Sequence, residues 1–533
     1  MRRVLVLFLA CLGCAGPTPA DAGAVDAGVD AGLPPGPWRS ALYPEGWTPD
    51  LVDDAGRFLH DFSWAGYHHG EAEPGAPASA AVLEVVAYGA DPTGGADSTA
   101  AIQAAIDEAS IDGGVVHLAA GTYRVDGTLR VAARGVVLRG DGPDATRLWL
   151  TALSGMAGRA HITFAGELSS DLEVRLTEDG APRATTVRVA DPSGLAVGDD
   201  VDVGWVITPD FVEEHAMTGY WMVFDDEWQP FFRRTVVAID GDQVTLDVPL
   251  RYPAKVRDAA SLRRTRGWLR EVGLEALAIA TAGDADEAWA ASQTFAVRFE
   301  GVADGWVRDV ASFPSPGATD GAHLASGGLT VRASKRVTVS DTHLAAAQNL
   351  GPGGNGYLFE VRTSSELLYR DCSGVDGRHA FITNWGFGTS GVVWLRVRTA
   401  GGRSLPMRTG GIVTVGLSDY HHSLATANLV DSSVLDDGWS ATNRLGFSSG
   451  AGHGATESVF WNTSGAGQIR SLQWGWGYVI GTAPALDVTT DDAPLEQLDT
   501  EPPDWVEGLG RAADLEPSSL YEDQLARRLA GAP

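Results

Sequence analysis

Apolar residues fall mostly in short segments of three to five positions, separated by glycine and polar turns. Segments of this length are typical of short strands. From residue 296 onward such segments recur roughly every 23 to 43 residues, which is typical of a solenoid with variable loops. The recurring segments are Ala296–Phe299, Leu329–Val331, Tyr357–Val361, Ala380–Asn384 and Ser423–Ala425. The pattern therefore predicts a coil of short strands.

Most of these segments are followed, about ten residues later, by a second strand-like segment that contains a charged residue. Four aspartates hold a similar place in these second segments: Asp309, Asp341, Asp371 and Asp431. We interpret them as a structural ladder at one turn of the coil and not as catalytic groups.

One helix is predicted near the start of the coil, after a strand at Val82–Ala87. Asp97 or Ser98 is a suitable N-cap, and the helix is expected to run to about Ser110. Its apolar face consists of Ile102, Ala105, Ile106 and Ala109.

Residues 186–253 interrupt the coil with longer alternating segments and an Asp240-Gly241 turn, which predict an antiparallel, β-rich insertion.

Ser518 or Ser519 is expected to cap a short helix through Leu529 that covers the last rung. The expected parts are a signal peptide at 1–14, a flexible tether at 15–37, an aromatic-rich extension at 38–81, the start of the coil with its capping helix at 82–185, the insertion at 186–253, further rungs at 254–490, and a tail with a short helix at 491–533.

The first residues predict export. Arg2 and Arg3 precede the apolar run Val4–Leu12, which is too short for a membrane span. Small residues and Cys14 follow, which resembles a bacterial lipoprotein signal with lipidation at that cysteine; Cys11 is a second candidate. We expect an outer-membrane or cell-surface lipoprotein, and otherwise a secreted protein, with the lipid anchor as the only membrane contact.

Composition narrows the possible partners. The chain of 533 residues has a net charge of −30, which argues against nucleic acid as a partner. The only lysines are Lys255 and Lys335, so a site for anions would use arginine. After processing at Cys14, Cys372 is the single cysteine left, so no internal disulfide is expected. We expect a monomer.

Four consecutive motifs carry a resemblance to a known family. They are Tyr88-Gly89-Ala90-Asp91, the helical segment 101–106, Gly113-Gly114-Val115-Val116 and Gly121-Thr122-Tyr123. Together they resemble the opening of the pectate-lyase superfamily. The resemblance implies an all-β fold: a single-stranded, right-handed parallel β-helix with an N-terminal capping helix, here with a β-rich insertion.

In such a coil, equivalent side chains of successive rungs stack about 4.8 Å apart, so a polymer along the axis meets residues from distant segments. Polar residues at the predicted starts of rungs are therefore the candidates for a site. The candidate substrate-binding residues are His323, Asn355, Asn384, Trp385, Arg403, Arg408, His422 and Trp439. The candidate catalytic residues are His379, Arg378, His421, Asp376, Asp436 and Asp437.

Two reactions on a polysaccharide fit these residues. In β-elimination on a uronate, His379 or His421 would remove the proton beside the carboxylate. Arg378, Arg403 or Arg408 would neutralise that carboxylate. In hydrolysis, Asp376, Asp436 and Asp437 would supply the acid and the base. Asp436-Asp437 resembles the aspartate pair of polygalacturonase-type hydrolases, but the flanking motifs of that family are incomplete.

We favour the lyase because the candidates are richer in His and Arg than in paired carboxylates. The alternatives are a glycoside hydrolase and a non-catalytic glycan-binding surface protein. No metal-binding spacing is recognisable and no cofactor is expected, although a calcium requirement is left open. The aromatic residues between 220 and 232 are expected to form a wall or lid over a carbohydrate groove.

Overall fold

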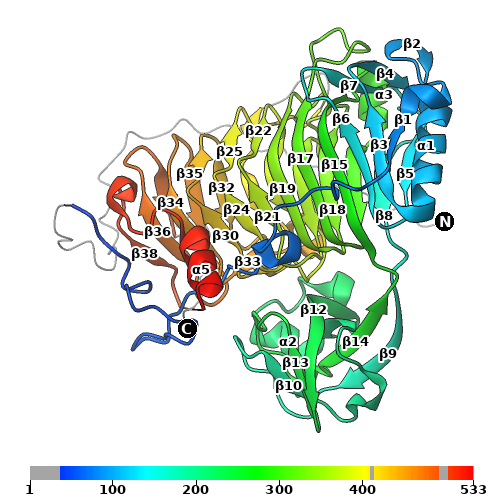
Figure 1. The fold of residues 1–533 in the computed structure, drawn as a ribbon. Helices are drawn as coiled ribbons and strands as arrows, with labels where there is room; N and C mark the ends of the chain where they lie inside the picture. The colour runs from blue at the N-terminus through cyan, green and yellow to red at the C-terminus, as the bar shows by residue number, and fades with distance from the viewer. Residues whose placement is uncertain (1–35, 408–412, 491–501, 532–533) are drawn as a thin grey trace, which may run out of the picture.

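The computed structural model describes residues 36–407, 413–490 and 502–531 and forms an all-β parallel β-helix, which confirms the predicted fold class. Figure 1 shows the rungs stacked from the cyan strands beside the N-terminal helix to the orange and red strands. One side of the coil is a sheet of ten parallel strands. In spatial order they are β5 (Leu129–Val131), β8 (Ala160–Ala165), β16 (Phe295–Glu300), β18 (Gly327–Arg332), β20 (Tyr357–Arg362), β23 (His379–Thr383), β28 (Ser418–Tyr420), β32 (Gly438–Ala441), β35 (Gln468–Ser471) and β37 (Asp487–Thr489).

The other sides of the coil form one continuous sheet of 18 strands, because three long strands bend around a corner of the rung. The long strands are β15 (Leu269–Ala280), β17 (Val302–Ser312) and β19 (Lys335–Ala345). The others are β1 (Val82–Glu84), β2 (Thr93–Asp97), β3 (Gly114–Leu118), β4 (Gly121–Val125), β6 (Val136–Gly140), β7 (Thr146–Leu150), β21 (Leu368–Arg370), β22 (Ser373–Val375), β24 (Val393–Leu395), β25 (Arg398–Ala400), β30 (Leu429–Asp431), β31 (Val434–Leu435), β34 (Val459–Thr463), β36 (Tyr478–Thr482) and β38 (Trp505–Glu507).

A ladder of left-handed residues makes that corner. Asp309, Asp341 and Asp371 have φ of 53°, 47° and 57°, and the pairing of their neighbours places them side by side on successive rungs. Aspartate tolerates this conformation better than most residues. Asp431 does not belong to the ladder, contrary to the prediction: the equivalent residue is Ser432, with φ of 50°. The variable length of the preceding loop shifts the register by one residue.

The helix α1 (Thr99–Asp112) lies where the sequence predicts it and covers the first rungs. Its four predicted apolar residues are buried against the interior of the coil. Asp97 accepts a hydrogen bond from the Thr99 N–H at 2.9 Å, and Gly113, with φ of 83°, ends the helix. The match follows from the 3.6-residue spacing, which depends only on local sequence.

The insertion is a separate antiparallel sheet of six strands. In spatial order they are β10 (Thr186–Arg188), β13 (Gln243–Leu246), β12 (Trp228–Asp240), β11 (Asp200–Val206), β14 (Ser261–Arg266) and β9 (Ser169–Arg175). The predicted limits of 186–253 leave out β9 and β14. Both strands are rich in polar residues, and β9 buries only Val174, so neither has an apolar pattern that marks it.

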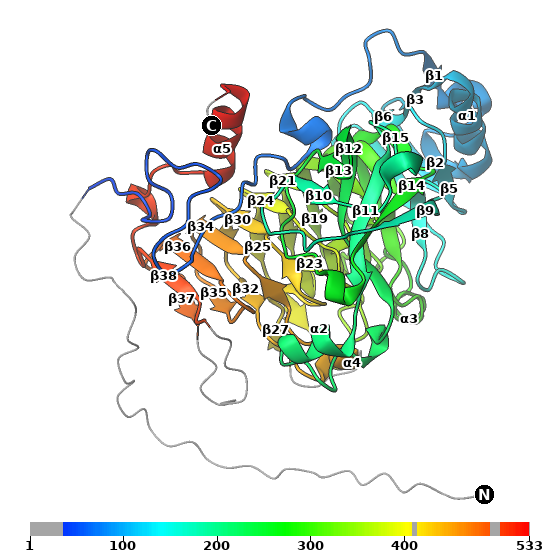
Figure 2. The ribbon, with the colours of Figure 1, turned by 90° about the horizontal axis from the view of Figure 1, so that it is seen from below.

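The aromatic residues of the insertion form its own core and not a lid. Trp221, Phe231 and Phe232 are buried, and Trp205 stacks on Phe231 with ring centres 3.6 Å apart. The prediction of a lid is therefore wrong for these residues. The same core includes Phe387 of the coil, so the insertion packs against the outside of the coil, as Figure 2 shows.

The N-terminal extension and the helix α5 (Leu520–Leu529) lie together on the outer face of the 18-stranded sheet. Ser519 caps α5 as predicted, but the helix lies on the side of the coil and does not cover its last rung. Buried Asp431 holds it there, because this carboxylate accepts hydrogen bonds from the Ser519 hydroxyl at 2.8 Å and the Tyr521 N–H at 2.9 Å.

Short elements complete the fold. They are α2 (Pro209–Glu214), α3 (Ala285–Ala290), α4 (Phe447–Gly450), the 3-10 turns η1 (Tyr67–Gly70), η2 (Val85–Tyr88), η3 (Pro192–Gly194), η4 (Met222–Phe224), η5 (Val256–Asp258) and η6 (Ala512–Asp514), and the strand pairs β26 (Arg403–Ser404) with β27 (Thr414–Val415) and β29 (Ala425–Thr426) with β33 (Ala455–Thr456). Within the described residues, no helix has both the length and the apolar character to cross a bilayer.

Candidate functional site

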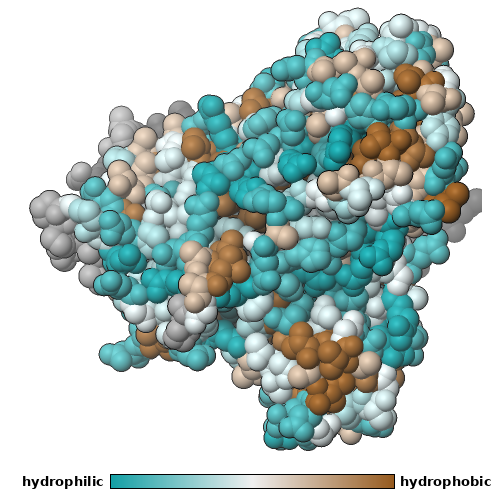
Figure 3. All heavy atoms as spheres, in the orientation of Figure 1, coloured by the Kyte–Doolittle hydropathy of each residue, from teal (hydrophilic) through white to brown (hydrophobic). Residues whose placement is uncertain are grey.

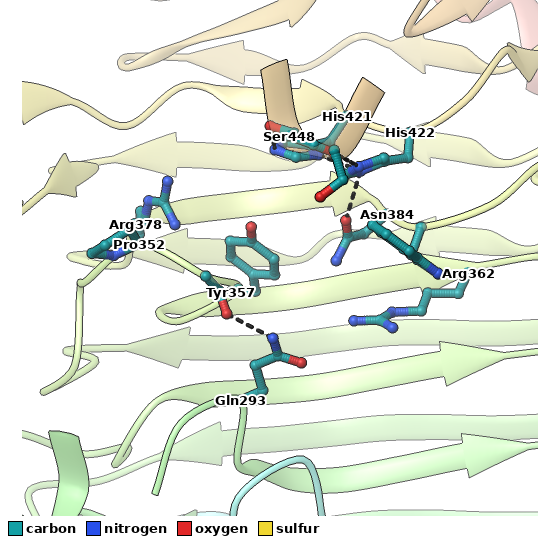
Figure 4. Close-up of a pocket in the computed structure, with 13 residues that line it drawn as sticks. Gln293, Pro352, Tyr357, Arg362, Arg378, Asn384, His421, His422 and Ser448 are labelled. Atoms are coloured by element: carbon teal, nitrogen blue, oxygen red, sulfur yellow. Dashed lines mark hydrogen bonds between the residues drawn. The ribbon is translucent and has the colours of Figure 1, made fainter. Parts of the chain in front are cut away.

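A cavity of about 510 Å³ opens on the outer face of the ten-stranded sheet. Its floor comes from β20, from β23 with its flanking residues, and from the two residues after β28. One wall is the loop 352–354 with Gln293, and the opposite wall is α4. Figure 4 shows Tyr357 in the middle of this floor, with Arg378 to one side and His421 and His422 beyond it.

The register of the sheet brings distant residues together at the cavity. Val361, Thr383 and Tyr420 are paired across β20, β23 and β28, so the residues that follow them, Arg362, Asn384 and His421, project from neighbouring strands. The sequence predicts such a row, but it places His421-His422 at the start of a strand. The structure places both histidines after β28, a strand of only three residues that the apolar pattern does not mark.

Arg378 supplies positive charge to the cavity. Its guanidinium donates to the Gly351 carbonyl at 3.1 Å and to the Ser404 hydroxyl at 3.2 Å, and it lies 5.9 Å from the centre of the Tyr357 ring. None of these contacts is a carboxylate. Among the described residues Arg378 has no ion-pair partner, so its charge is available to an anion in the cavity.

Glu360 organises the polar residues beneath the cavity. Its carboxylate accepts hydrogen bonds from Arg332 at 2.9 Å, Arg362 at 2.8 Å, Thr330 at 2.6 Å and Asn384 at 2.8 Å. Burial raises the pKa of Glu360, but the two guanidinium groups prevail and hold it at about 2. Glu360 is therefore a carboxylate that fixes the positions of Arg362 and Asn384.

His421 and His422 contact each other directly. Their Nδ1 atoms are 2.5 Å apart, and the Nε2 atom of His422 lies 2.6 Å from the Ser448 carbonyl oxygen. Burial and the nearby Arg444 lower the pKa of His421 well below its ordinary value. Burial likewise lowers the pKa of His422, to about 4. Both imidazoles are thus neutral at neutral pH, and a neutral imidazole can accept a proton.

Tyr357 has its hydroxyl in the cavity. Burial raises the pKa of this phenol to about 12, so it keeps its proton at neutral pH. Its ring lies 5.1 Å from the ring of His379, which in turn lies 6.3 Å from the ring of His421. A proton donor and a proton acceptor therefore line the same cavity.

His379, a predicted base, lies on β23, between Tyr357 and His421. Its Nδ1 contacts the Leu417 carbonyl oxygen, and it does not line the cavity. Burial lowers its pKa to about 3. His379 consequently packs between Tyr357 and His421.

Asn355 and Trp385 shape the edges of the cavity. The Asn355 side chain accepts from the Gln293 N–H at 2.7 Å and donates to the Pro352 carbonyl at 2.9 Å, so it holds one wall without lining the space itself. Trp385 is 43% exposed, and its ring lies 4.9 Å from that of His422. This exposed ring is suited to stacking on a sugar.

Three predicted substrate-binding residues lie elsewhere. His323 contacts the Ser312 hydroxyl at 2.9 Å, Arg403 lies 3.7 Å from Asp376 outside the cavity, and Trp439 is fully buried in the core of the coil. The sequence pattern finds polar and aromatic residues near rung edges, but it does not determine which side of the strand they occupy. Arg408 and the lipidation candidate Cys14 lie outside the described residues.

Two of the three predicted aspartates, Asp436 and Asp437, line a second cavity, of about 540 Å³, on the same side of the coil. Asp436 forms an ion pair with Arg398 at 3.0 Å, and Asp437 accepts from the Gly402 N–H at 3.0 Å. Burial raises the pKa of Asp437. Asp376 lines neither cavity. The two predicted sets of catalytic residues are thus separate in space.

The sequence prediction misses several residues of the first cavity. Tyr357, Arg362, Gln293 and Ser448 line it, and Glu360 lies beneath it. The sequence of β20 could have indicated Glu360 and Arg362, because they are the only charged residues of this otherwise apolar strand. Among the described residues, no three His, Cys, Asp or Glu side chains are grouped as metal ligands would be.

The fold and this cavity define a parallel β-helix with a polar, arginine-containing cavity on the outer face of one sheet. Residues 82–166 match a family model described as "Rhamnogalacturonase A/epimerase, pectate lyase-like", which confirms the resemblance to the pectate-lyase superfamily at the start of the coil. The matched segment contains α1 and the first rungs but none of the cavity residues. No curated protein sequence matches the chain.

Solved structures of similar shape include two phage tailspikes and an exopolygalacturonase. The tailspike of Acinetobacter baumannii bacteriophage AP22, in complex with capsular saccharide, is 10% identical, with 86% of this chain and 72% of that chain covered and a TM-score of 0.46. The tailspike of Pseudomonas phage phi297 is 15% identical, with 80% of each chain covered and a TM-score of 0.39. An exopolygalacturonase of Thermotoga maritima is 10% identical, with 78% of this chain and 77% of that chain covered and a TM-score of 0.32.

Proposed function

We propose that this chain is an exported enzyme that cleaves a uronate-containing polysaccharide by β-elimination in the first cavity. The observation that supports this most is Arg378, which presents a positive charge without a described carboxylate partner beside His421 and Tyr357. The carboxylate of an anionic sugar could form an ion pair with Arg378. The family model and the titles of the similar structures support a carbohydrate as the substrate class.

The proposed reaction assigns one role to each of these three residues. Arg378 binds the uronate carboxylate and stabilises the negative charge that develops there. His421 takes the proton from the carbon next to the carboxylate, and the electrons of that C–H bond form a C=C bond as the glycosidic C–O bond breaks. The leaving oxygen takes the proton of the Tyr357 hydroxyl, which water later replaces.

A panel of uronate-containing and neutral polysaccharides tests this proposal. Elimination creates a C=C bond conjugated to the carboxyl group, which ultraviolet absorbance detects, together with new reducing ends. His421→Ala should abolish both signals, and His343→Ala, which changes an exposed histidine on β19, should change neither. Unchanged elimination by His421→Ala would contradict the proposed site. A parallel assay with a chelator tests the calcium requirement.

A glycoside hydrolase acting at the second cavity is the second candidate. It is favoured by the raised pKa of Asp437 and by its buried Oδ2 atom, which has no hydrogen-bond partner among the described residues. A carboxyl group with a raised pKa next to a second carboxyl group, here that of Asp436, is the arrangement that hydrolysis uses. Reducing ends without ultraviolet absorbance, lost in Asp437→Asn, would establish this alternative. Retention of the polymer without any product would indicate a binding protein.

We also propose that the chain is anchored by lipidation at Cys14. The support is the sequence alone: two arginines, a short apolar run and small residues around this cysteine. Metabolic labelling with a fatty acid should modify the wild-type chain and not Cys14→Ser. If Cys14→Ser is still labelled and Cys11→Ser is not, the lipid is attached to Cys11.

A further inference from the structure

The contacts of His422 restrict where its hydrogens can be. The Ser448 carbonyl oxygen, 2.6 Å from Nε2, can only accept, so Nε2 carries a hydrogen. Asn384 has a fixed orientation, because its amide nitrogen donates to the Glu360 carboxylate at 2.8 Å. The amide oxygen of Asn384 therefore faces His422 Nδ1, at 3.2 Å. Figure 4 shows this chain of contacts from α4 to Asn384.

The hydrogen on His421 follows from these restrictions. Its Nδ1 lies 2.5 Å from His422 Nδ1, and two ring nitrogens at that distance share one hydrogen. When both rings are neutral, His422 already has its hydrogen on Nε2, so the shared hydrogen belongs to His421 Nδ1. The Nε2 atom of His421 then has a free lone pair, which lies 3.3 Å from the Ser448 hydroxyl at the edge of the cavity. That is the form that can act as a base.

We propose that the two histidines act as one proton acceptor: His421 takes the substrate proton on Nε2 and passes its Nδ1 proton to His422. This inference rests on the elimination proposed above. After the transfer, His421 is neutral with its hydrogen on Nε2, and the positive charge lies on His422. Return of the shared proton to His421 and release of the Nε2 proton to water restore the starting state.

Asn384 favours this transfer. The partially negative amide oxygen of Asn384 lies 3.2 Å from His422 Nδ1 and therefore favours positive charge on this ring. Once His422 carries the positive charge, this oxygen stabilises it electrostatically, and the Glu360 carboxylate lies on the other side of the amide. His422 is therefore a positioning residue that both selects the tautomer of His421 and accepts its charge.

The charges around the pair explain why sharing is needed. Arg444 faces both histidines, Arg378 also faces His421, Arg362 also faces His422, and the neutral His379 lies beside His421. Asp419 forms an ion pair with Arg444, and Glu360 is reached through Asn384. An imidazolium on either ring would face two guanidinium groups, but only the one on His422 contacts the Asn384 oxygen.

Nitrogen NMR of histidine-labelled protein without substrate reads the tautomers directly. Between pH 7 and 8, as a rough window above the ordinary His pKa, we expect the hydrogen on Nδ1 in His421 and on Nε2 in His422. In His422→Phe, we expect His421 to change to the Nε2–H tautomer. A hydrogen on Nε2 of His421 in the wild-type protein would overturn the proposal. This measurement requires no enzymatic activity, so its result tests the arrangement of the two histidines even if the chain does not catalyse elimination.

Kinetics tests the catalytic part of the inference. His422→Phe should lower kcat about a hundredfold, the scale of general-base catalysis, with KM nearly unchanged. The acid limb of its pH profile should move to lower pH, because an isolated His421 binds a proton less readily. His343→Phe, the matched control on β19, should keep the wild-type profile. A wild-type pH profile in His422→Phe would overturn the proposed proton sharing.

Discussion

The guanidinium of Arg378 lies 5.9 Å from the centre of the Tyr357 ring, and no described carboxylate pairs with it. Arginines near this cavity otherwise have such partners: Arg362 pairs with Glu360 and Arg444 with Asp419. Arg378 is thus the cation that a negatively charged substrate would meet on entering the cavity.

Arg378→Gln should lower kcat/KM for a uronate polymer by about 10- to 100-fold, because a charge-assisted hydrogen bond contributes about 1.5–3 kcal/mol. Steady-state kinetics on the wild-type enzyme and the variant checks this. Arg130→Gln, an exposed arginine on β5, is the matched control and should keep the wild-type rate. Equal losses in the two variants would mean that long-range charge, not this contact, binds the polymer.

Trp385→Ala should raise KM about fivefold while kcat stays near the wild-type value. The exposed ring offers a stacking surface next to the reacting groups, and aromatic contacts contribute about 0.5–1.5 kcal/mol. Trp385→Phe should restore most of the affinity. A drop in kcat without a change in KM would show that Trp385 instead positions His422.

Glu360→Gln should lower the free energy of unfolding by about 3 kcal/mol at pH 7, since it leaves two arginines without their buried carboxylate. Burial opposes ionisation, yet the guanidinium groups hold the pKa of Glu360 at about 2, below its unfolded value. Its contribution is therefore present above the unfolded pKa and is lost as the pH falls towards 2.

Denaturant titrations of wild type and Glu360→Gln at several pH values should show the difference shrinking from about pH 4 downward. Glu167→Gln, a nearly fully exposed carboxylate, should show no comparable difference. A constant difference across this range would contradict the ionised state assigned to Glu360.

Asp431→Asn should stabilise the protein above pH 7. Burial raises the pKa of Asp431 to about 7, above its unfolded value, so the folded state binds more protons between about pH 4 and 7. Stability is therefore lost as the pH rises through 7, and asparagine removes this loss while its oxygen can still accept from Ser519 and Tyr521. Thermal melts across this pH range measure the effect. A less stable variant at pH 8 would contradict it.

Local features of the fold could be predicted from the sequence, whereas those that depend on register could not. The helix α1 follows from a face of four apolar residues, and the parallel coil follows from short segments that recur. By contrast, Asp431 is displaced by one position from the aspartate ladder, and Trp439 points into the core. Loop lengths set the register of each rung, and a shift of one residue turns a side chain to the opposite face.

The candidate site could likewise be predicted in part from the sequence. The prediction that imidazole and guanidinium groups from distant rungs meet on one face agrees with the positions of Arg378, Asn384, His421 and His422. It could not distinguish His379 from His421 as the imidazole that lines the cavity, because that depends on the Leu417 carbonyl after the β26–β27 pair. Nor could it find Ser448, which α4 brings to the cavity from a later rung.

Digestion of a uronate polysaccharide in water enriched in heavy oxygen tests the central claim most directly. Elimination breaks the chain without adding water, so mass spectrometry should find unlabelled new ends, with one new end lighter by one water than a hydrolysis product. His421→Ala should give no such product, while His343→Ala should match the wild type. Heavy oxygen at every new reducing end, formed equally by His421→Ala, would contradict elimination at this cavity.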